Sequence, residues 1–390
     1  MRGSILFNGN VAREADFITR FKDRILASRH QEASIRSSKK VVMITAAWKK
    51  DEFNEGHIRS ALNGIGVPSR WDENGFDVNI QNLSVYYEFN AWRAKEPELY
   101  KLYHAKQEVI KQLKQFYRRK NSHLVSLLKE QNALLKQTFP DSSLGGVLEY
   151  PVQQMRKDLS VFSAKELQFH YCCQDIQETM KSIIDNDSKM VDICNELDLS
   201  FQAASGVTQN PFYKEIKRRL EERILSANSI FIFGGHVAVL YNRLNFFKLK
   251  GAMVEALRRG TSLYTVSAGS GVLCNSIILY NDYAEDRHHA TDFEFFENGF
   301  GIVNRLQVFP HCMDRIKTDD PDNLAYLAHR FQSSCCVGMN QESYLLMESV
   351  TEGGQKRQRF TSVGEKDGVY VFDRFGRKVL KKMGEEVALR

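Results

Sequence analysis

Thr261-Ser-Leu-Tyr-Thr-Val266, followed by Ser267-Ala-Gly-Ser-Gly271, is the stretch of sequence that decides the fold. The first six residues predict a buried strand, and the small residues after it permit a sharp turn into an apolar, helix-compatible run. A serine at such a turn lies at the carboxyl end of a sheet with its hydroxyl exposed. The turn also directs backbone N–H groups, including that of Ala268, at the place where an oxyanion would form.

Ser267 is therefore a candidate nucleophile for acyl transfer. The G-x-S-x-G spacing of many serine hydrolases is incomplete, because Thr265 stands where the first glycine would be. Two other interpretations stay open on these residues alone. One is a site for an anion or phosphate at the start of a helix, and the other is a tight turn without a function.

The segments around this stretch alternate between strand and helix patterns. Residues 229–233 form a strand pattern that ends at Gly234-Gly235, and residues 244–259 show helical spacing. The first seventy residues repeat the alternation, and the C-terminal part adds extended segments with a turn at 366–368. This order is typical of a mostly parallel sheet flanked by helices, so we place residues 1–85 and 206–390 in one α/β domain with a single sheet and a C-terminal β-hairpin.

Residues 86–205 interrupt this alternation. Apolar side chains recur there at spacings of three and four, the segment 140–146 forms a turn between long helices, and a further helical pattern runs from 164 to about 185. The sequence therefore predicts a large helical insertion in the α/β domain.

The charge is unevenly distributed along the chain. There are 54 Lys and Arg against 48 Asp and Glu, a formal net charge of +6. Residues 101–137 alone hold nine basic and two acidic residues, so the remaining 45 bases and 46 acids nearly cancel. We therefore expect a basic insertion. It could bind nucleic-acid phosphates, pair with a second copy as a homo-oligomer through its leucine stripe, or form a lid with a solvated basic face.

Other classes of protein are disfavoured by patterns that the sequence lacks. No run approaches 18 consecutive apolar residues and the N-terminus has no signal-peptide core, so we expect a cytoplasmic protein without a membrane span. The seven cysteines form no C-x-x-C pair and the Gly-rich nucleotide signatures are missing, so we expect neither a metal nor a cofactor. The residues Asp286, His288, His289 and Asp292 fit no firm ligand spacing and predict a polar loop.

A nucleophilic serine needs a base, and His311 is the candidate at a strand end. It ends the strand-like run 306–311, 44 residues after Ser267, so it would lie at the same carboxyl edge. His288 and His289 are competing candidates. Gly235 ends the preceding strand and would bring a second backbone N–H to this edge.

The order of these motifs resembles that of the dipeptidase E and cyanophycinase family of serine peptidases. The matching features are strand-Gly-Gly, helix, strand-S-A-G-S, Gly-Phe-Gly-Ile at 299–302, Phe-Pro-His at 309–311 and Val-Gly-Met-Asn-Gln-Glu-Ser-Tyr-Leu at 337–345. The resemblance covers about residues 206–375 and, more weakly, 1–65. It implies a flavodoxin-like fold similar to that of class I glutamine amidotransferases, and hydrolysis of a peptide, isopeptide or amide bond in a small, acidic peptide.

The resemblance also implies roles for individual residues. Ser267 matches the nucleophile and His311 the catalytic histidine, while the backbone of Gly235 and Ala268 matches the oxyanion hole. Candidates for binding the substrate or orienting the histidine are His236, Arg305, Arg315, Gln341 and Glu342.

Two positions depart from the family pattern. The family has a glutamate three residues after the glycine that matches Gly338, whereas this sequence has Gln341 there and Glu342 next to it. A glutamine can orient an imidazole but does not stabilise its charged form as a carboxylate does. The alternative function is therefore a catalytically impaired domain that binds or assembles through its insertion. The second departure, His236, replaces a smaller polar residue and concerns the substrate more than the reaction.

Overall fold

The computed structural model describes residues 2–152, 163–280, 293–364 and 368–389. Its largest sheet has seven strands in the order β11-β10-β1-β5-β4-β2-β3, of which the five from β1 to β3 are parallel and β10 and β11 are antiparallel. The strands are β1 (Ile5–Asn8), β2 (Val41–Ile44), β3 (Ile80–Asn82), β4 (Ser229–Ile232), β5 (Ser262–Thr265), β10 (Tyr344–Glu352) and β11 (Gln355–Ser362). Segments from both sides of the insertion thus meet in one mostly parallel sheet, and the predicted fold class is confirmed.

The prediction of a single sheet is wrong. A four-stranded sheet has the order β13-β12-β9-β8 and a two-stranded sheet pairs β6 with β7. Their strands are β6 (Ser276–Tyr280), β7 (Phe293–Asn298), β8 (Leu306–Pro310), β9 (Cys335–Met339), β12 (Val369–Phe372) and β13 (Lys378–Lys381). The four-stranded sheet has its own apolar core, in which Phe309 of β8 and Cys336 of β9 pack against α14 (Pro321–Arg330). Short apolar strands do not specify their neighbours, so the sequence could not separate the sheets.

The C-terminal hairpins also differ from the prediction. A C-terminal hairpin is present between β12 and β13. Residues 365–367 of the expected turn lie outside the described residues, and the strands on either side of it, β11 and β12, belong to different sheets. Instead β10 pairs with β11 through Gly353-Gly354, in the register Glu352 to Gln355. Both glycines have positive φ, 57° and 79°, as a two-residue type I′ turn requires.

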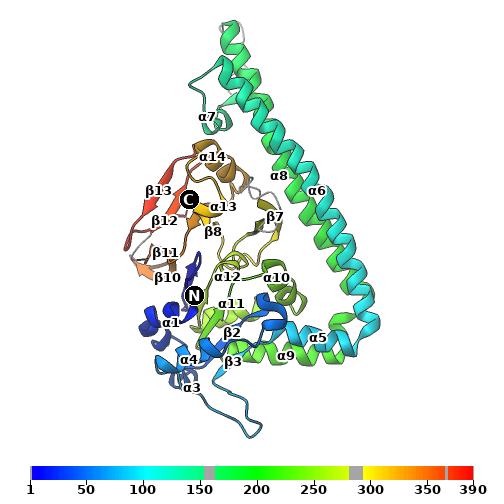
Figure 1. Cartoon of the computed structure of the whole chain (residues 1–390), viewed down its shortest axis with the longest axis vertical. Coiled ribbons are helices and arrows are strands. Elements are labelled where there is room, and N and C mark those ends of the chain that lie inside the picture. The colour runs from blue at the N-terminus through cyan, green and yellow to red at the C-terminus, as the bar shows by residue number, and fades with distance from the viewer. Residues whose placement is uncertain (1, 153–162, 281–292, 365–367, 390) are drawn as a thin grey trace.

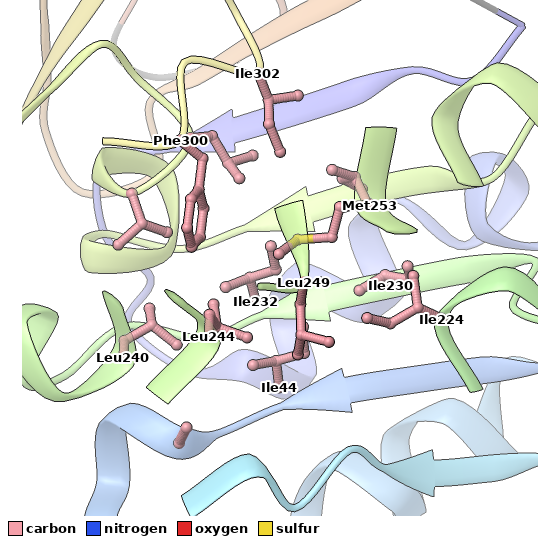
Figure 2. Packing of buried hydrophobic residues seen from close by; sticks show 14 of the residues in the cluster. Ile44, Ile224, Ile230, Ile232, Leu240, Leu244, Leu249, Met253, Phe300 and Ile302 are labelled. Atoms are coloured by element: carbon pink, nitrogen blue, oxygen red, sulfur yellow. The ribbon is translucent and has the colours of Figure 1, made fainter. Parts of the chain in front are cut away.

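Helices cover both faces of the central sheet (Figure 1). Alternate residues of β4 face opposite sides, so Ile230 and Ile232 join one core while Phe231 joins the other. Figure 2 shows Ile230 and Ile232 among side chains from α10 (Val237–Phe246) and α11 (Lys250–Arg259). Each fully buried aliphatic side chain of this kind stabilises the fold by about 1.5–3 kcal/mol.

The remaining elements are short except in the insertion. They are α1 (Glu14–Arg20), α2 (Lys22–Leu26), α3 (Ala33–Ser38), η1 (Ala46–Asp51), α4 (Gly56–Gly64), α5 (Val85–Lys95), α7 (Leu144–Leu148), η4 (Val207–Gln209), α9 (Pro211–Leu225), α12 (Ala268–Gly271) and α13 (Cys312–Arg315). None of the helices in the described ranges is both long and apolar enough to cross a membrane.

The insertion is dominated by two long helices that pack side by side (Figure 1). They are α6 (Pro97–Thr138) and α8 (Ala164–Ser205), each of 42 residues and so about 63 Å long. A capping box of Ser163 and Glu166 begins α8, which continues some twenty residues beyond the predicted end near 185. The division of the chain into an α/β domain and an insertion domain stays a prediction.

The insertion as a whole is not basic, contrary to the prediction. Helix α8 carries three lysines and eight acidic residues, and residues 86–205 contain 16 basic and 16 acidic residues. The lysines of α6 also meet acids: Lys106 lies 2.6 Å from Asp198 of α8, and Lys114 lies 2.9 Å from Glu297 of β7. Some of the basic residues of 101–137 are therefore paired with acidic residues, and these ion pairs connect α6 to α8 and to β7.

Candidate active site

Ser267 lies in the sharp turn between β5 and α12. Its backbone has φ 48° and ψ −110°, a region that residues with a side chain rarely adopt. The turn is possible only with a small residue behind it, because a Cβ on Gly269 would lie 2.1 Å from the carbonyl oxygen of Ile232. The predicted strand-turn-helix arrangement is present.

Hydrogen bonds from β1 hold this turn in place. The carbonyl oxygen of Asn8 accepts from the Ser267 N–H at 3.0 Å and from the Ser270 hydroxyl at 2.9 Å. The Asn8 N–H donates to Ser270 Oγ at 3.2 Å, and Thr265 Oγ1 lies 2.8 Å from the same oxygen. Ser270 is fully buried, so it fixes the turn while Ser267 faces the cavity.

His311 follows β8 of the four-stranded sheet and has φ 54°. Its Nε2 lies 3.2 Å from Ser267 Oγ, a distance at which a proton can pass between them. Asn340, after β9, accepts through Oδ1 from the Met313 N–H at 3.0 Å and from Cys312 Sγ at 3.1 Å. These bonds fix the helical turn that follows His311.

Two backbone amides beside the serine are candidates for the oxyanion hole. Gly235 (φ 125°) and Ala268 both line the cavity, and neither amide donates to another group in the described part of the chain. Trp48 Nε1 donates to the Gly234 carbonyl at 3.1 Å, and the His236 N–H donates to the Ala47 carbonyl at 3.1 Å. The loop after β2 thereby holds Gly234 and Gly235 in place.

The cavity around this pair of residues has a volume of about 740 Å³. That is within the range of sites that bind small molecules. Besides Ser267 and His311, its walls carry four charged or titratable side chains: Glu14, Lys49, His236 and Arg315. The cavity can therefore take a ligand that is itself polar or charged.

His236 begins α10, and its Nδ1 accepts from the Val239 N–H at 3.3 Å. Burial, together with the positive charge of Lys49, lowers the pKa of His236. The imidazole is therefore neutral near pH 7, with Nε2 carrying its proton because Nδ1 is an acceptor.

Arg305 precedes strand β8 and Arg315 follows it, so they lie beyond opposite ends of this strand. Arg315 is half-buried, ends α13 one turn after His311 and lines the cavity. Arg305 is exposed and precedes β8, whereas His311 follows it. A five-residue strand spans about 16 Å, so the structure does not bring Arg305 to the site.

Gln341 and Glu342 do not line the cavity. Gln341 is exposed, and its backbone pairs with that of Asn10. The Glu342 carboxylate accepts from the Ala12 N–H at 3.1 Å and from the Tyr344 hydroxyl. Its two oxygens are thus directed at the loop after β1 and at β10, which corrects the expectation that this carboxylate orients His311.

The prediction missed the residues that support the site from behind. Asn8, Asn340 and Trp48 act through backbone groups of neighbouring loops, and only the Asn8-Gly-Asn10 turn after the first strand gave a signal in the sequence. Within the described ranges no three His, Cys, Asp or Glu side chains are placed to hold a metal ion. The polar segment with Asp286, His288, His289 and Asp292 lies outside the described residues.

Comparisons with known proteins bear on the same part of the chain. Residues 192–352 match the model of peptidase family S51, a segment that contains β4, β5, β8 and both Ser267 and His311. A solved structure of a peptidase from an acI-B1 Actinobacterium is also similar, with 14% identity, a TM-score of 0.47, and coverage of 100% of this chain and 97% of that one. No curated protein matches the sequence.

Proposed function

We propose that this chain is a serine peptidase-type hydrolase in which Ser267 is the nucleophile and His311 the general base. The match of residues 192–352 to peptidase family S51 agrees with the predicted resemblance to the dipeptidase E family. The observation that carries the assignment is the 3.2 Å separation of Ser267 Oγ and His311 Nε2 inside the cavity. The strained turn at Ser267 supports it, because such strain is retained mainly where function requires it.

The reaction proceeds through an acyl-enzyme. Ser267 Oγ attacks the carbonyl carbon as His311 Nε2 takes its proton, and the N–H groups of Gly235 and Ala268 stabilise the resulting oxyanion. The imidazolium then gives the proton to the leaving amine as the C–N bond breaks. Water, deprotonated by the same imidazole, hydrolyses the ester and restores Ser267.

A carboxylate from Glu342 has no part in this proposal, since its oxygens are bound to Ala12 and Tyr344. The left-handed backbone of His311 and the hydrogen bonds of Asn340 to the following turn help to hold this histidine in position.

The substrate class is a short peptide, isopeptide or amide with an acidic group near the cleaved bond. The cavity volume suits a few residues of peptide, and Arg315 supplies a cation one helical turn from His311. The neutral His236, which lines the same cavity, adds a hydrogen-bond donor.

A fluorophosphonate probe tests the nucleophile directly. Wild type and Ser276→Ala, which removes another serine of the cavity wall, should be labelled, while Ser267→Ala should not. Mass spectrometry of the labelled peptide should place the adduct on Ser267. Equal labelling of wild type and Ser267→Ala would overturn the assignment.

A second function, self-assembly through the insertion, is favoured by one feature of α6. Five large apolar residues on this helix are exposed at spacings of seven or eleven and so form one stripe: Leu102, Val109, Phe116, Leu127 and Leu134. The stripe is about 48 Å long, and with a helix width of about 10 Å two copies would cover roughly 1,000 Å², the lower limit for a specific interface.

The occupant that fits this stripe is a second copy of the chain. The stripe reaches this area when it packs on the same stripe of a second copy, so that α6 of one copy contacts α6 of the other. Light scattering should give the mass of a dimer for wild type and Ser122→Glu, and of a monomer for Phe116→Glu. A monomeric wild type would reject the idea, and salt-sensitive binding of an oligonucleotide would favour nucleic acid as the partner of residues 101–137.

A further inference from the structure

Lys49 shares the unusual backbone conformation of Ser267. It has φ 60° and ψ −121° inside η1, close to the 48° and −110° of the serine. Both residues follow parallel strands, β2 and β5, at their carboxyl ends, and both line the same cavity. A lysine in this region is strained by about 1–3 kcal/mol relative to a glycine.

The loop around Lys49 is held rigidly enough to maintain the strain. On one side the Trp48 indole binds the Gly234 carbonyl and stacks on His57. On the other side the Glu52 carbonyl accepts from Thr45 Oγ1 at 2.7 Å and from Asn82 Nδ2 at 2.8 Å. Because nothing in the local packing requires the long side chain at position 49, a glycine would serve the loop better.

The Lys49 ammonium also lacks a counter-charge. It forms no ion pair or hydrogen bond with any residue of the described ranges, and its side chain is exposed at the cavity. His236 lines the same cavity, and the positive charge of Lys49, after burial, contributes to lowering the pKa of His236. A strained, unpaired cation beside the oxyanion donors suits an anionic ligand group.

We infer that Lys49 is a specificity-determining residue that binds a carboxylate of the substrate in the cavity that Arg315 also lines. The inference rests on the proposed function, since it concerns what reaches Ser267. Two carboxylates have the required chemistry: the side chain of an acidic residue and the C-terminal group of a short peptide. Either would form a charge-assisted hydrogen bond with the ammonium.

Protection of Ser267 from the fluorophosphonate probe tests this without a known substrate. The protecting peptides are Ala-Asp-Ala and Ala-Asn-Ala, each with a free and an amidated C-terminus. In wild type, the peptide that retains the recognised carboxylate should halve the labelling rate at a concentration about tenfold lower than its neutral counterpart, as expected for one partly buried charge pair. The Asp/Asn and free/amidated comparisons separate the two sources.

Three variants of Lys49 and one control complete the design. Lys49→Met should reduce this preference to less than about twofold, and Lys49→Arg should restore most of it. Lys49→Gly should also lose the preference while raising the melting temperature by a few degrees, because it relieves the strain. Lys50→Met, a change of the exposed neighbouring lysine, is the matched control and should behave as wild type.

The outcomes separate this inference from the proposed function. Equal protection by all four peptides in wild type, or an unchanged preference in Lys49→Met, overturns the role of Lys49 while leaving the nucleophile intact. Absence of Ser267 labelling in wild type overturns the proposed function itself.

Discussion

Ser267 Oγ and His311 Nε2 lie 3.2 Å apart although their strands belong to different sheets. Strand β5 is in the middle of the seven-stranded sheet, and β8 is at the edge of the four-stranded one. The geometry of the pair therefore depends on how firmly the two sheets are held together. The contact of α12 with β8 and the bonds of Asn8 and Asn340 fix the two turns from behind.

Two neighbouring serines should give opposite phenotypes. Ser267→Ala should abolish fluorophosphonate labelling with little change in stability, since its hydroxyl faces the cavity. Ser270→Ala removes a fully buried hydroxyl that bonds to Asn8, and should reduce the free energy of unfolding by about 1–3 kcal/mol. Urea unfolding and the rate of fluorophosphonate labelling measure the two effects. A Ser270→Ala protein as stable as wild type would contradict the structural role.

Gly234 is expected to tolerate no side chain. A Cβ there would lie 3.0 Å from both Ser267 Cβ and the Val266 carbonyl oxygen, so Gly234→Ala should displace the serine and slow its labelling by at least about tenfold. Gly251→Ala is the control, because no atom lies within 4 Å of its Cβ position in α11. That change should leave labelling unchanged and stabilise the helix by about 0.5–1 kcal/mol. Equal labelling of the two variants would show that the turn adapts.

The sequence was sufficient for features that depend on local patterns. The strand and small-residue turn at Ser267, and the strand that ends at His311, are each encoded within a few residues. The sequence placed both at one sheet edge, whereas the two residues meet across two different sheets. The long apolar periodicity likewise predicted the helical insertion. The hairpin at Gly353-Gly354 is also encoded locally, by two adjacent glycines between two extended segments, although the sequence analysis predicted a turn at 366–368.

Features set by tertiary packing could not be predicted in this way. Nothing in Ala-Ala-Trp-Lys-Lys indicates that Lys49 has positive φ, because its conformation is imposed by the bonds around Trp48 and Glu52. The direction of the Glu342 carboxylate depends on Tyr344 and the loop after β1. The charge of the insertion differs from the prediction because the basic residues of 101–137 are balanced by acidic residues elsewhere in 86–205, eight of them in α8.

A buried ion pair should be essential for attaching α8 to the four-stranded sheet. Asp187 accepts from Arg330 Nε at 2.7 Å and from Nη2 at 2.9 Å, and Asn121 Nδ2 donates to it at 2.7 Å. Asp187→Ala removes the carboxylate that binds two nitrogens of the Arg330 guanidinium, and should lower the free energy of unfolding by about 3–5 kcal/mol.

The double variant Asp187→Leu/Arg330→Met removes both charges and should recover most of that loss. Asp185→Ala, on the exposed side of the same helix, is the control and should change stability by less than about 0.5 kcal/mol. Denaturant unfolding followed by circular dichroism measures all three variants. Equal effects of Asp187→Ala and Asp185→Ala would mean that the pair contributes nothing to the attachment.

Glu52 should make the stability of the protein depend on pH. It follows η1, is fully buried, and accepts hydrogen bonds from the first turn of α5. Burial raises the pKa of Glu52 from 4.5 to about 7, although the N–H groups of Tyr86 and Tyr87 donate to the carboxylate and oppose the rise. The folded state thus holds the proton more tightly than the unfolded state. This group therefore contributes stability below pH 4.5 that is lost as the pH rises through 7.

The size of this effect follows from the shift in pKa, and amounts to at most about 3 kcal/mol. Glu52→Gln keeps an oxygen to accept from the start of α5 but does not ionise. Between pH 5 and pH 8 the free energy of urea unfolding should fall by about 1–3 kcal/mol more in wild type than in this variant. Asp51→Asn, at an exposed carboxylate next to it, should retain the wild-type dependence. Identical slopes for wild type and Glu52→Gln would show that this carboxyl is ionised throughout that range.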